Sequence, residues 1–273
     1  MAVVAGLYTY PVKGCAGVAV REVALAEAGL AHDRSFMVIG EDGVFRSQRR
    51  DPRLAAVRPE VGADGTRLTL RAPGMDALHV EVRVDAEQRG VELFGVAYRG
   101  IDQGDAAARW LSEMLGKPSR MVRVPPDHGR VTDGLTPGTS GYADSSAVHL
   151  VSRASLRELN GRIDGEEVPM SRFRPNIVVD GWDSPHLEDS ARRIAIGGVE
   201  LGYTKLAIRC AVTTIDQAAG VKAGHEPLRT LASYRRAAAG GVAFGTKFSV
   251  LRTGKLELGM EVTVTEWGAS ELR

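Results

Sequence analysis

The chain has 273 residues, 44% of them hydrophobic, which is enough for one large domain or two of ordinary size. Its 35 basic and 34 acidic side chains nearly cancel, so no net charge attracts it to nucleic acid or an anionic membrane, and any anion site must be local. Only Cys15 and Cys210 are present, which excludes a disulfide scaffold and a four-cysteine zinc or iron–sulfur site within the chain.

The first hundred residues are typical of short strands separated by turns. β-Branched and apolar residues recur there at two-residue spacing, and the pairs Asp42-Gly43 and Asp64-Gly65 favour turns. We therefore expect a small β-barrel or sandwich in this part of the chain. Its strands are predicted at 3–12, 22–30, 34–45, 67–73, 78–85 and 91–98.

The hydrophobic period changes to that of a helix at residues 104–117. Gly116 and Pro118 end this run. We expect the helix to mark a boundary between a domain of residues 1–118 and a second domain of residues 119–273. The apolar positions at helical spacing are Ala108, Leu111, Met114 and Leu115.

A loop rich in Gly, Pro, Ser, Thr and Asp follows, over about residues 120–146. A loop of that length in a compact protein is usually functional or mobile, and residues 125–146 are expected to shape a substrate entrance. A helix over 152–163 comes next, with Ser152 as its predicted N-cap. Further strands are predicted at 174–180, 192–196, 198–208, 211–215, 247–251 and 260–266, with a helix at 226–237.

No apolar run approaches the roughly 20 residues of a membrane-spanning helix. The opening stretch MAVVAGLYTYPVKG has no basic region ahead of its apolar residues, unlike a signal peptide. We therefore expect a soluble, unprocessed, cytoplasmic protein that binds neither a membrane nor nucleic acid.

Basic residues at turns and strand ends are candidates for binding an anion. Lys13 lies in the turn of YPVKGCAG, where backbone N–H groups can converge on an anion, although a lysine in a turn is more often only solvated. Arg172 and Arg174 flank Phe173; in an extended chain both arginines point to one side, while Phe173 points into the core. Two guanidinium groups on one side suit a phosphate. Arg34 and the run SQRRDPR add further basic side chains.

The segment KLAIRCAVTTIDQAAG delivers several reactive side chains directly after an apolar strand. A thiol beside an arginine, as at Arg209-Cys210, is a candidate low-pKa nucleophile or metal ligand, and inert packing in the core is the plain alternative. The six histidines have no metal-ligand spacing, so a hydrolase based on Cys and His is an alternative without further support. The polar residues that follow the cysteine are Thr213, Thr214 and Asp216.

Seven motifs in order span essentially the whole chain: YPVKGC, DRSFMVI, SQRRDPRL, FRPNIVVDG, RCAVTTIDQ, EPLRTLASYR and GMEVTV. Together they resemble the molybdenum-cofactor sulfurase C-terminal (MOSC) family, in the branch with an N-terminal β-barrel domain that includes the amidoxime-reducing components. The resemblance implies a mixed, β-rich α+β fold. Its expected parts are a small N-terminal β-barrel domain over 1–118 and a MOSC β-barrel domain with a few helices over 119–273.

The resemblance also implies a molybdenum-pyranopterin cofactor held between the domains, whose phosphate would be the anion. Cys210 occupies the position of the molybdenum ligand; thiolate is a soft donor, and Arg209 would favour the deprotonated sulfur. Asp216 would be a second catalytic residue that relays protons. Gly14 stands where the family commonly has serine and offers only a backbone N–H, and Ile208 replaces a frequent polar residue. The implied cofactor-binding residues are Lys13, Gly14, Arg34, Ser145, Ser146, Arg174, Asn176, Arg209, Thr213 and Thr214.

The implied reaction is reduction of small N-hydroxylated compounds, such as amidoximes and hydroxylamines, by oxygen transfer to molybdenum. Electrons would come from a separate donor protein of the ferredoxin or flavin type, since the chain cannot build its own cluster. Two alternatives remain open. One is a sulfur-transfer or cofactor-delivery module that uses a persulfide on Cys210, and the other is a small-molecule binding protein that kept the fold without the catalysis.

Overall fold

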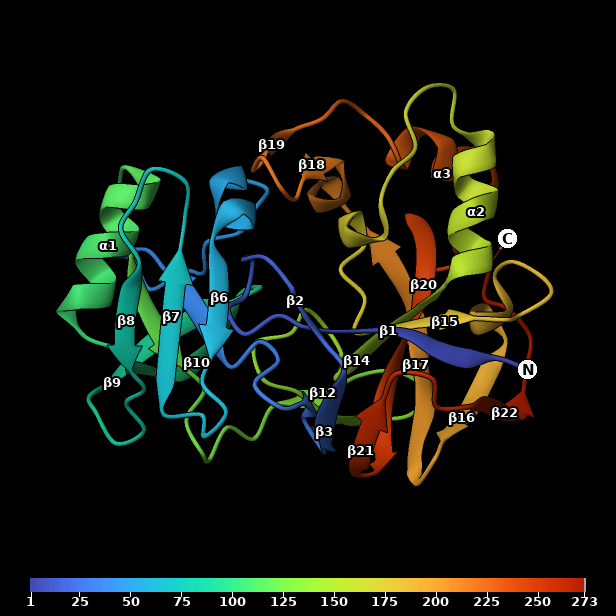
Figure 1. The fold of residues 1–273 in the computed structure, drawn as a ribbon, viewed down its shortest axis with the longest axis horizontal. Helices are drawn as coiled ribbons and strands as arrows, with labels where there is room; N and C mark the ends of the chain where they lie inside the picture. Colours follow the sequence, from blue (N-terminus) through green and yellow to red (C-terminus); the bar gives the residue numbers. More distant parts are fainter. Residues whose placement is uncertain (273) are drawn as a thin grey trace.

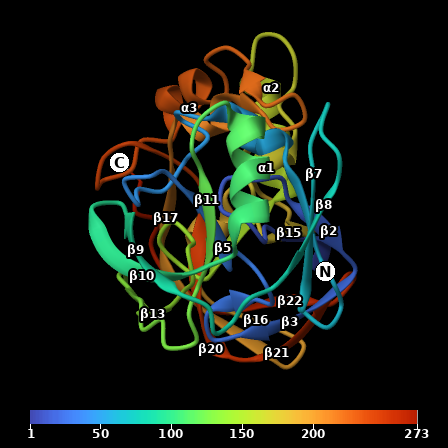
Figure 2. The ribbon, with the colours of Figure 1, turned by 90° about the vertical axis from the view of Figure 1, so that its left-hand side faces the viewer.

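The computed structural model describes residues 1–272, and its strands form two sheet-containing bodies that meet along a junction (Figure 1). The first body contains a four-stranded sheet, in the order β5-β11-β10-β9, and a three-stranded sheet, β6-β7-β8. Helix α1 (Asp105–Leu115) packs against this body and faces the viewer in Figure 2. The strands are β5 (Phe36–Ile39), β6 (Arg58–Val61), β7 (Arg67–Arg71), β8 (Leu78–Glu81), β9 (Gln88–Leu93), β10 (Val96–Asp102) and β11 (Arg120–Arg123).

The second body is built on an eight-stranded sheet in the order β2-β1-β15-β14-β20-β17-β16-β22. The three-stranded sheet β21-β3-β4 belongs to the same body, because β21 also packs against β17. The strands are β1 (Val3–Thr9), β2 (Val18–Val20), β3 (Glu22–Ala26), β4 (Gly29–Leu30), β14 (Val148–Ser152), β15 (Ile177–Asp180), β16 (Ala191–Ile196), β17 (Val199–Arg209), β20 (Val242–Arg252), β21 (Gly254–Glu257) and β22 (Val262–Trp267).

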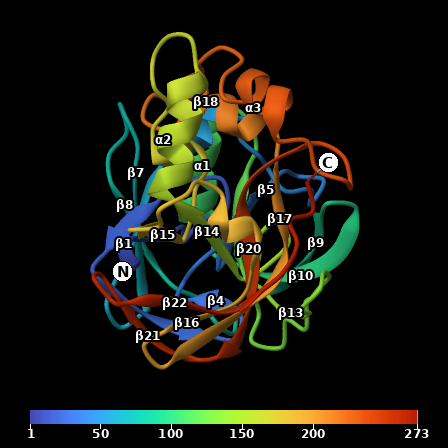
Figure 3. The ribbon, with the colours of Figure 1, turned by 90° about the vertical axis from the view of Figure 1, so that its right-hand side faces the viewer.

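Helices α2 (Arg153–Arg162) and α3 (Leu228–Tyr234) lie together at the upper end of this sheet in Figure 3. Two small hairpins lie beside the large sheets. The hairpin of β12 (Val131–Thr132) and β13 (Gly138–Thr139) contacts β20, and that of β18 (Ile215–Asp216) and β19 (Val221–Lys222) contacts the 3-10 helices Pro52–Ala56 and Ala211–Thr214. Within the described chain, no helix has both the length and the apolar character needed to cross a bilayer. Short 3-10 helices complete the list: Pro52–Ala56, Met170–Arg172, Leu187–Asp189 and Ala211–Thr214.

Backbone pairing joins strands of the first 30 residues to strands of the second half of the chain. Strand β1 pairs antiparallel with β15, and β3 pairs antiparallel with β21. Strand β11 lies after residue 118, within the predicted second domain, but pairs with β5 and β10 of the first body. The predicted domain boundary at residue 118 stays a prediction. In both bodies, backbone hydrogen bonds join strands that precede residue 118 to strands that follow it.

The mixed, β-rich fold is confirmed, as are the three predicted helices and most predicted strands. Two local predictions were wrong. Residues 211–214 of the predicted strand 211–215 form a 3-10 turn, because the hydroxyls of Thr213 and Thr214 donate to carbonyls three residues earlier; only Ile215 lies in a strand, β18. Arg172 and Arg174 do not alternate along a strand, because Arg172 ends a 3-10 helix and Arg174 has a left-handed φ of 55°.

Ser152 caps helix α2 as predicted: its hydroxyl accepts a hydrogen bond from the backbone N–H of Ser155 at 3.0 Å. We expect Ser152→Ala to lower the free energy of unfolding by about 1 kcal/mol, because the freed N–H loses its acceptor. Chemical denaturation measures this change. Ser233→Ala, at an exposed position inside α3, is the matched control and should be nearly neutral; equal effects of the two changes would contradict the capping argument.

Candidate functional site

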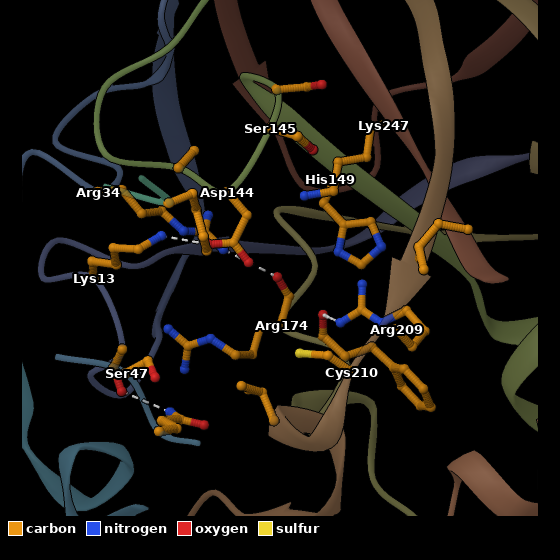
Figure 4. A pocket seen from close by; sticks show the side chains of 18 of the residues that line it. Lys13, Arg34, Ser47, Asp144, Ser145, His149, Arg174, Arg209, Cys210 and Lys247 are labelled. Atoms are coloured by element: carbon orange, nitrogen blue, oxygen red, sulfur yellow. Dashed lines mark hydrogen bonds and ion pairs between the residues drawn. The ribbon is translucent and has the colours of Figure 1, made fainter. Parts of the chain in front are cut away.

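A cavity of about 320 Å³ lies at the junction of the two bodies (Figure 4). It is lined by segments far apart in sequence: the turn after β1, residues 45–49, the loop before β14, residues 173–176, the end of β17 and the middle of β20. Among the lining residues that the described chain, 1–272, contributes, Asp144 is the one acidic side chain. Eight are basic: Lys13, Arg34, Arg46, Arg49, Arg174, Lys205, Arg209 and Lys247.

Lys13 is buried at one side of the cavity. Its Nζ donates to the Tyr142 carbonyl at 2.9 Å and forms an ion pair with Asp144. The rings of Phe45 and Phe94 flank it, with centroids 5.4 and 4.9 Å from Nζ. Burial lowers the pKa of Lys13, and the carboxylate of Asp144 opposes that shift. The ion pair, the carbonyl contact and the two rings therefore hold the Lys13 side chain in place at the cavity wall.

Arg34 and Arg174 stack on the ring of Tyr10, with guanidinium carbons 4.2 and 4.3 Å from its centroid. Arg34 donates to Asp33 at 2.6 Å and to Asn176 Oδ1 at 3.2 Å. Burial disfavours its charge, but Asp33, Tyr10 and Asp144 together outweigh that effect and raise the pKa of Arg34, whereas burial lowers the pKa of Arg174. Both arginines have a left-handed backbone, a strained conformation that persists only where surrounding contacts fix it.

Cys210 follows the last residue of β17, is partly exposed, and has its sulfur directed into the cavity in Figure 4. The neighbouring Arg209 donates from Nη2 to the Phe173 carbonyl at 3.0 Å, which directs its guanidinium along the cavity wall. Burial lowers the pKa of Arg209, and the Cys210 sulfur is among the groups that oppose this shift. The end of one strand thus presents a thiol and a fixed cation side by side.

Three buried polar atoms in the lining have no hydrogen-bond partner within residues 1–272: Ser146 Oγ, His149 Nε2 and Arg209 Nε. Buried polar atoms almost always have a partner, so three together indicate a surface that is complementary to a polar ligand. Burial, followed by the charges of Arg209 and Lys247, lowers the pKa of His149 well below its usual value. Its imidazole is therefore neutral and can donate or accept a hydrogen bond.

Arg130 fixes the loop that carries the serines. Its guanidinium donates to the carbonyls of Gly141 and Asp144, at 2.9 and 3.0 Å, and to that of Ala143. The side chain of Asp144 is 66% exposed, and although desolvation opposes it, the charge of Lys13 lowers the pKa of this carboxyl. The long loop predicted over 120–146 is thus anchored where it reaches the cavity.

The cavity brings together nine of the residues predicted for the site: Lys13, Gly14, Arg34, Ser145, Ser146, Arg174, Asn176, Arg209 and Cys210. Gly14 has a φ of 82°, and its carbonyl accepts from Gln48 Nε2 at 2.6 Å. Ile208 also lines the cavity and is 46% exposed.

Thr213, Thr214 and Asp216 lie outside this lining. The Thr213 hydroxyl donates to the Cys210 carbonyl at 2.9 Å, so it supports the turn below the thiol. The Asp216 carboxylate accepts from the backbone N–H groups of Ala218 and Ala219, which are the largest causes of its lowered pKa. This geometry gives no support to a proton relay through Asp216.

Sequence reasoning missed several lining residues. Lys247 had a visible signal, since it is a lysine in a strand whose residues 243–246, 248 and 249 are buried. Asp144 directly precedes the predicted serine pair, but nothing in the sequence joins it to Lys13, 131 residues away. The other missed residues that shape the cavity are Phe45, Gln48, Phe94 and His149.

Lys247 gives the cavity a pH dependence. Burial, with the positive charge of Arg209, lowers its pKa to about 8, so it is charged below that pH and neutral above it. We expect the affinity of the cofactor-free protein for sulfate, which does not itself titrate here, to fall several-fold between about pH 7 and pH 9. Calorimetric titration measures it. Lys247→Arg should retain affinity at the higher pH; an affinity of the native protein that is constant across this range would contradict the assignment.

Two family models and several known proteins are similar to this chain. The family model of the MOSC N-terminal beta barrel domain matches residues 1–118, and that of the MOSC domain matches residues 137–263. Mitochondrial amidoxime reducing component 2 of Rattus norvegicus is 35% identical over 278 residues, covering 94% of this chain and 81% of the relative. Mitochondrial amidoxime-reducing component 1 of Homo sapiens is 36% identical over 247 residues, covering 85% and 72%.

A molybdenum cofactor sulfurase of Danio rerio is also similar, at 31% identity over 260 residues, which cover 88% of this chain and 31% of that longer protein. The seven motifs, the two matched family models and the two amidoxime-reducing relatives, which are aligned over most of their length, all agree. The chain belongs to the family of proteins with a MOSC N-terminal β-barrel domain and a MOSC domain, alongside the mitochondrial amidoxime-reducing components.

Proposed function

We propose that this protein binds a molybdenum-pyranopterin cofactor in the cavity and reduces N-hydroxylated compounds such as amidoximes and hydroxylamines. The observation that carries the proposal is the Cys210 sulfur in a cavity lined by eight basic side chains and one acid. The names of the amidoxime-reducing relatives support the choice of substrate class.

The residues present fit such a group. Cys210 offers a thiolate, a soft ligand that suits molybdenum better than the oxygen ligands preferred by hard cations. Arg34, Arg174 and Lys13 are fixed by stacking or ion pairing, so they can bind a phosphate without losing much side-chain freedom. The unpartnered atoms of Ser146 and His149 suit the polar edge of a pterin.

When bound, the metal supplies the two-electron oxygen-transfer chemistry, and the chain supplies position and charge. Phe94 and Ile208, 43% and 46% exposed in the lining, offer apolar contacts to a substrate at the entrance. Lys247 Nζ, with a pKa lowered to about 8, can hold and release a proton near neutral pH, which suits a reduction that consumes protons. We assign this role to Lys247 in place of Asp216.

Electrons come from a separate donor protein in this proposal. The sequence contains two cysteines, and Cys15 is fully buried in the core of the first body, so the chain has no ligand set for an iron–sulfur cluster. A ferredoxin- or flavin-type protein would supply the two electrons at the open side of the cavity.

The test is metal analysis of protein purified from a host that makes the cofactor, together with a benzamidoxime assay driven by an artificial electron donor. We expect about one molybdenum per chain and reduction of benzamidoxime to benzamidine, because the cavity offers one thiolate ligand. Protein free of molybdenum from such a host, or loaded protein without turnover, would refute the proposal.

The sulfurase relative favours a second candidate, in which Cys210 carries a persulfide for sulfur transfer or cofactor delivery. The two candidates differ in the modification of one sulfur. Mass spectrometry of the protein during turnover detects a persulfide as added mass on the Cys210 peptide. An unmodified thiol throughout turnover would exclude the second candidate.

A further inference from the structure

A second cavity, of about 620 Å³, lies at the same junction on the other side of Arg174. Its volume falls within the roughly 300–1,000 Å³ of small-molecule sites. The first body contributes residues of β6 and β7, and the second contributes residues around β1 and β2; β2 and β6 pack against each other where the bodies meet (Figure 1). The lining residues used below are Tyr8, Tyr10, Gly17, Arg58, Arg71 and Arg174.

Two of its arginines form an unusual pair. Arg58 on β6 and Arg71 on β7 are direct cross-strand partners, so their side chains leave the same face of the sheet. Like charges opposite each other destabilise a sheet, and within the described residues neither guanidinium has an ion-pair partner. Glu60 lines the same cavity but forms no ion pair with either arginine. An anion bound between the two arginines would relieve their repulsion.

The rest of the second cavity is mainly apolar and aromatic. Tyr8 presents a ring to the cavity. The ring of Tyr10 is buried, stacked by Arg34 and Arg174 and lined by Gly17, where a Cβ would lie 2.5 Å from Cε1 of that ring. Pro59, Met170 and Pro175 add apolar surface. An aromatic ring and apolar side chains beside a pair of guanidinium groups match a flat apolar molecule with an anionic end.

A wall of side chains separates this cavity from the first. Gln217, in the second cavity, and Gln48, in the first, exchange two amide hydrogen bonds of 2.9 and 3.0 Å. Arg174 borders both cavities and donates to Gln217 Oε1 at 3.0 Å. The second cavity is thus a distinct compartment that shares one wall with the proposed cofactor site.

We propose that the second cavity is a ligand site for a small aromatic molecule that carries a phosphate, sulfate or carboxylate group. The anionic group binds between Arg58 and Arg71, and the ring packs against Tyr8 and Met170. The site is separate from the proposed cofactor site and does not depend on the reaction assigned there.

Calorimetric titration of the purified, molybdenum-loaded protein with 2-naphthyl phosphate tests the proposal. We expect one binding site, and a loss of affinity of at least about tenfold in the double variant Arg58→Ala/Arg71→Ala, because charge-assisted hydrogen bonds to the phosphate are lost. 2-Naphthol, which lacks the phosphate, should bind more weakly to the native protein and equally to both proteins. Arg67→Ala, an exposed arginine on the same strand outside the cavity, is the matched control and should bind normally.

Both altered side chains are exposed, so the double variant should fold, and thermal unfolding checks this. Arg71→Glu is a second variant, which should remove the preference for 2-naphthyl phosphate over 2-naphthol. Lys247→Met, in the first cavity, should leave binding unchanged. The proposal is overturned if the native protein does not bind the probe, if the double variant binds it as well as the native protein, or if Lys247→Met abolishes binding.

Discussion

Replacing Cys210 by serine is expected to abolish benzamidoxime reduction. The sulfur is directed into the cavity beside Arg209, and no other cysteine lines that cavity. The serine oxygen is a harder donor than sulfur, and the hydroxyl is a far weaker acid than a thiol. Serine therefore does not replace a thiolate ligand of a soft metal. We expect activity to fall by more than about 100-fold, since removal of groups that merely support a metal ligand already costs about 10–100-fold. Steady-state assays with an artificial electron donor measure the loss.

Cys15→Ala provides the matched control. Cys15 is fully buried in the core of the first body, and burial raises the pKa of its thiol to about 12, so it is an inert packing residue. This variant should keep its activity per bound molybdenum. Full activity of Cys210→Ser, or loss of activity in Cys15→Ala at normal molybdenum content, would contradict the assignment of the ligand.

Arg34→Met is expected to destabilise the fold and to weaken cofactor retention together. Arg34 neutralises Asp33, whose side chain is 2% exposed and also accepts the backbone N–H of Tyr10 at 2.8 Å. Removing one partner of a buried ion pair leaves an uncompensated charge, which costs about 3–5 kcal/mol of unfolding free energy. The variant also loses one of the two guanidinium groups stacked on Tyr10. Urea denaturation measures the stability, and metal analysis measures retention.

Arg49→Met is the matched control for the loss of stability. Arg49 is an exposed basic residue of the same cavity and has no ion pair in the described part of the chain. We expect its stability to change by less than about 0.5 kcal/mol. If Arg34→Met were as stable as Arg49→Met, the Asp33 pair would not support the site as described.

Much of the local structure was predictable from the sequence. Alternation of apolar residues predicted most strands of the first body, and the change to helical spacing located α1. Ser152 was identifiable as an N-cap from its residue type and the helical pattern after it. The pairing of β1 with β15 was not predictable in the same way, because it joins segments separated by most of the chain and leaves no local pattern.

The basic residues of the candidate site were predictable from the sequence, but the contacts that shape its cavity were not. Lys13, Arg34 and Arg174 come together at one cavity, as the resemblance implied. Arg172 does not join them, because the 3-10 turn before Phe173 directs it toward Asp216, with 3.8 Å between their nearest charged atoms. Partners such as Asp144 for Lys13 depend on tertiary contacts between distant loops, which residue types alone do not specify.

X-ray absorption at the molybdenum edge, on native protein and on Cys210→Ser protein that still contains metal, determines whether the Cys210 thiolate is a molybdenum ligand. We expect the variant to have one sulfur neighbour fewer around molybdenum than the native protein. The same number of sulfur neighbours in both proteins would show that Cys210 is not a ligand, contrary to the proposed function.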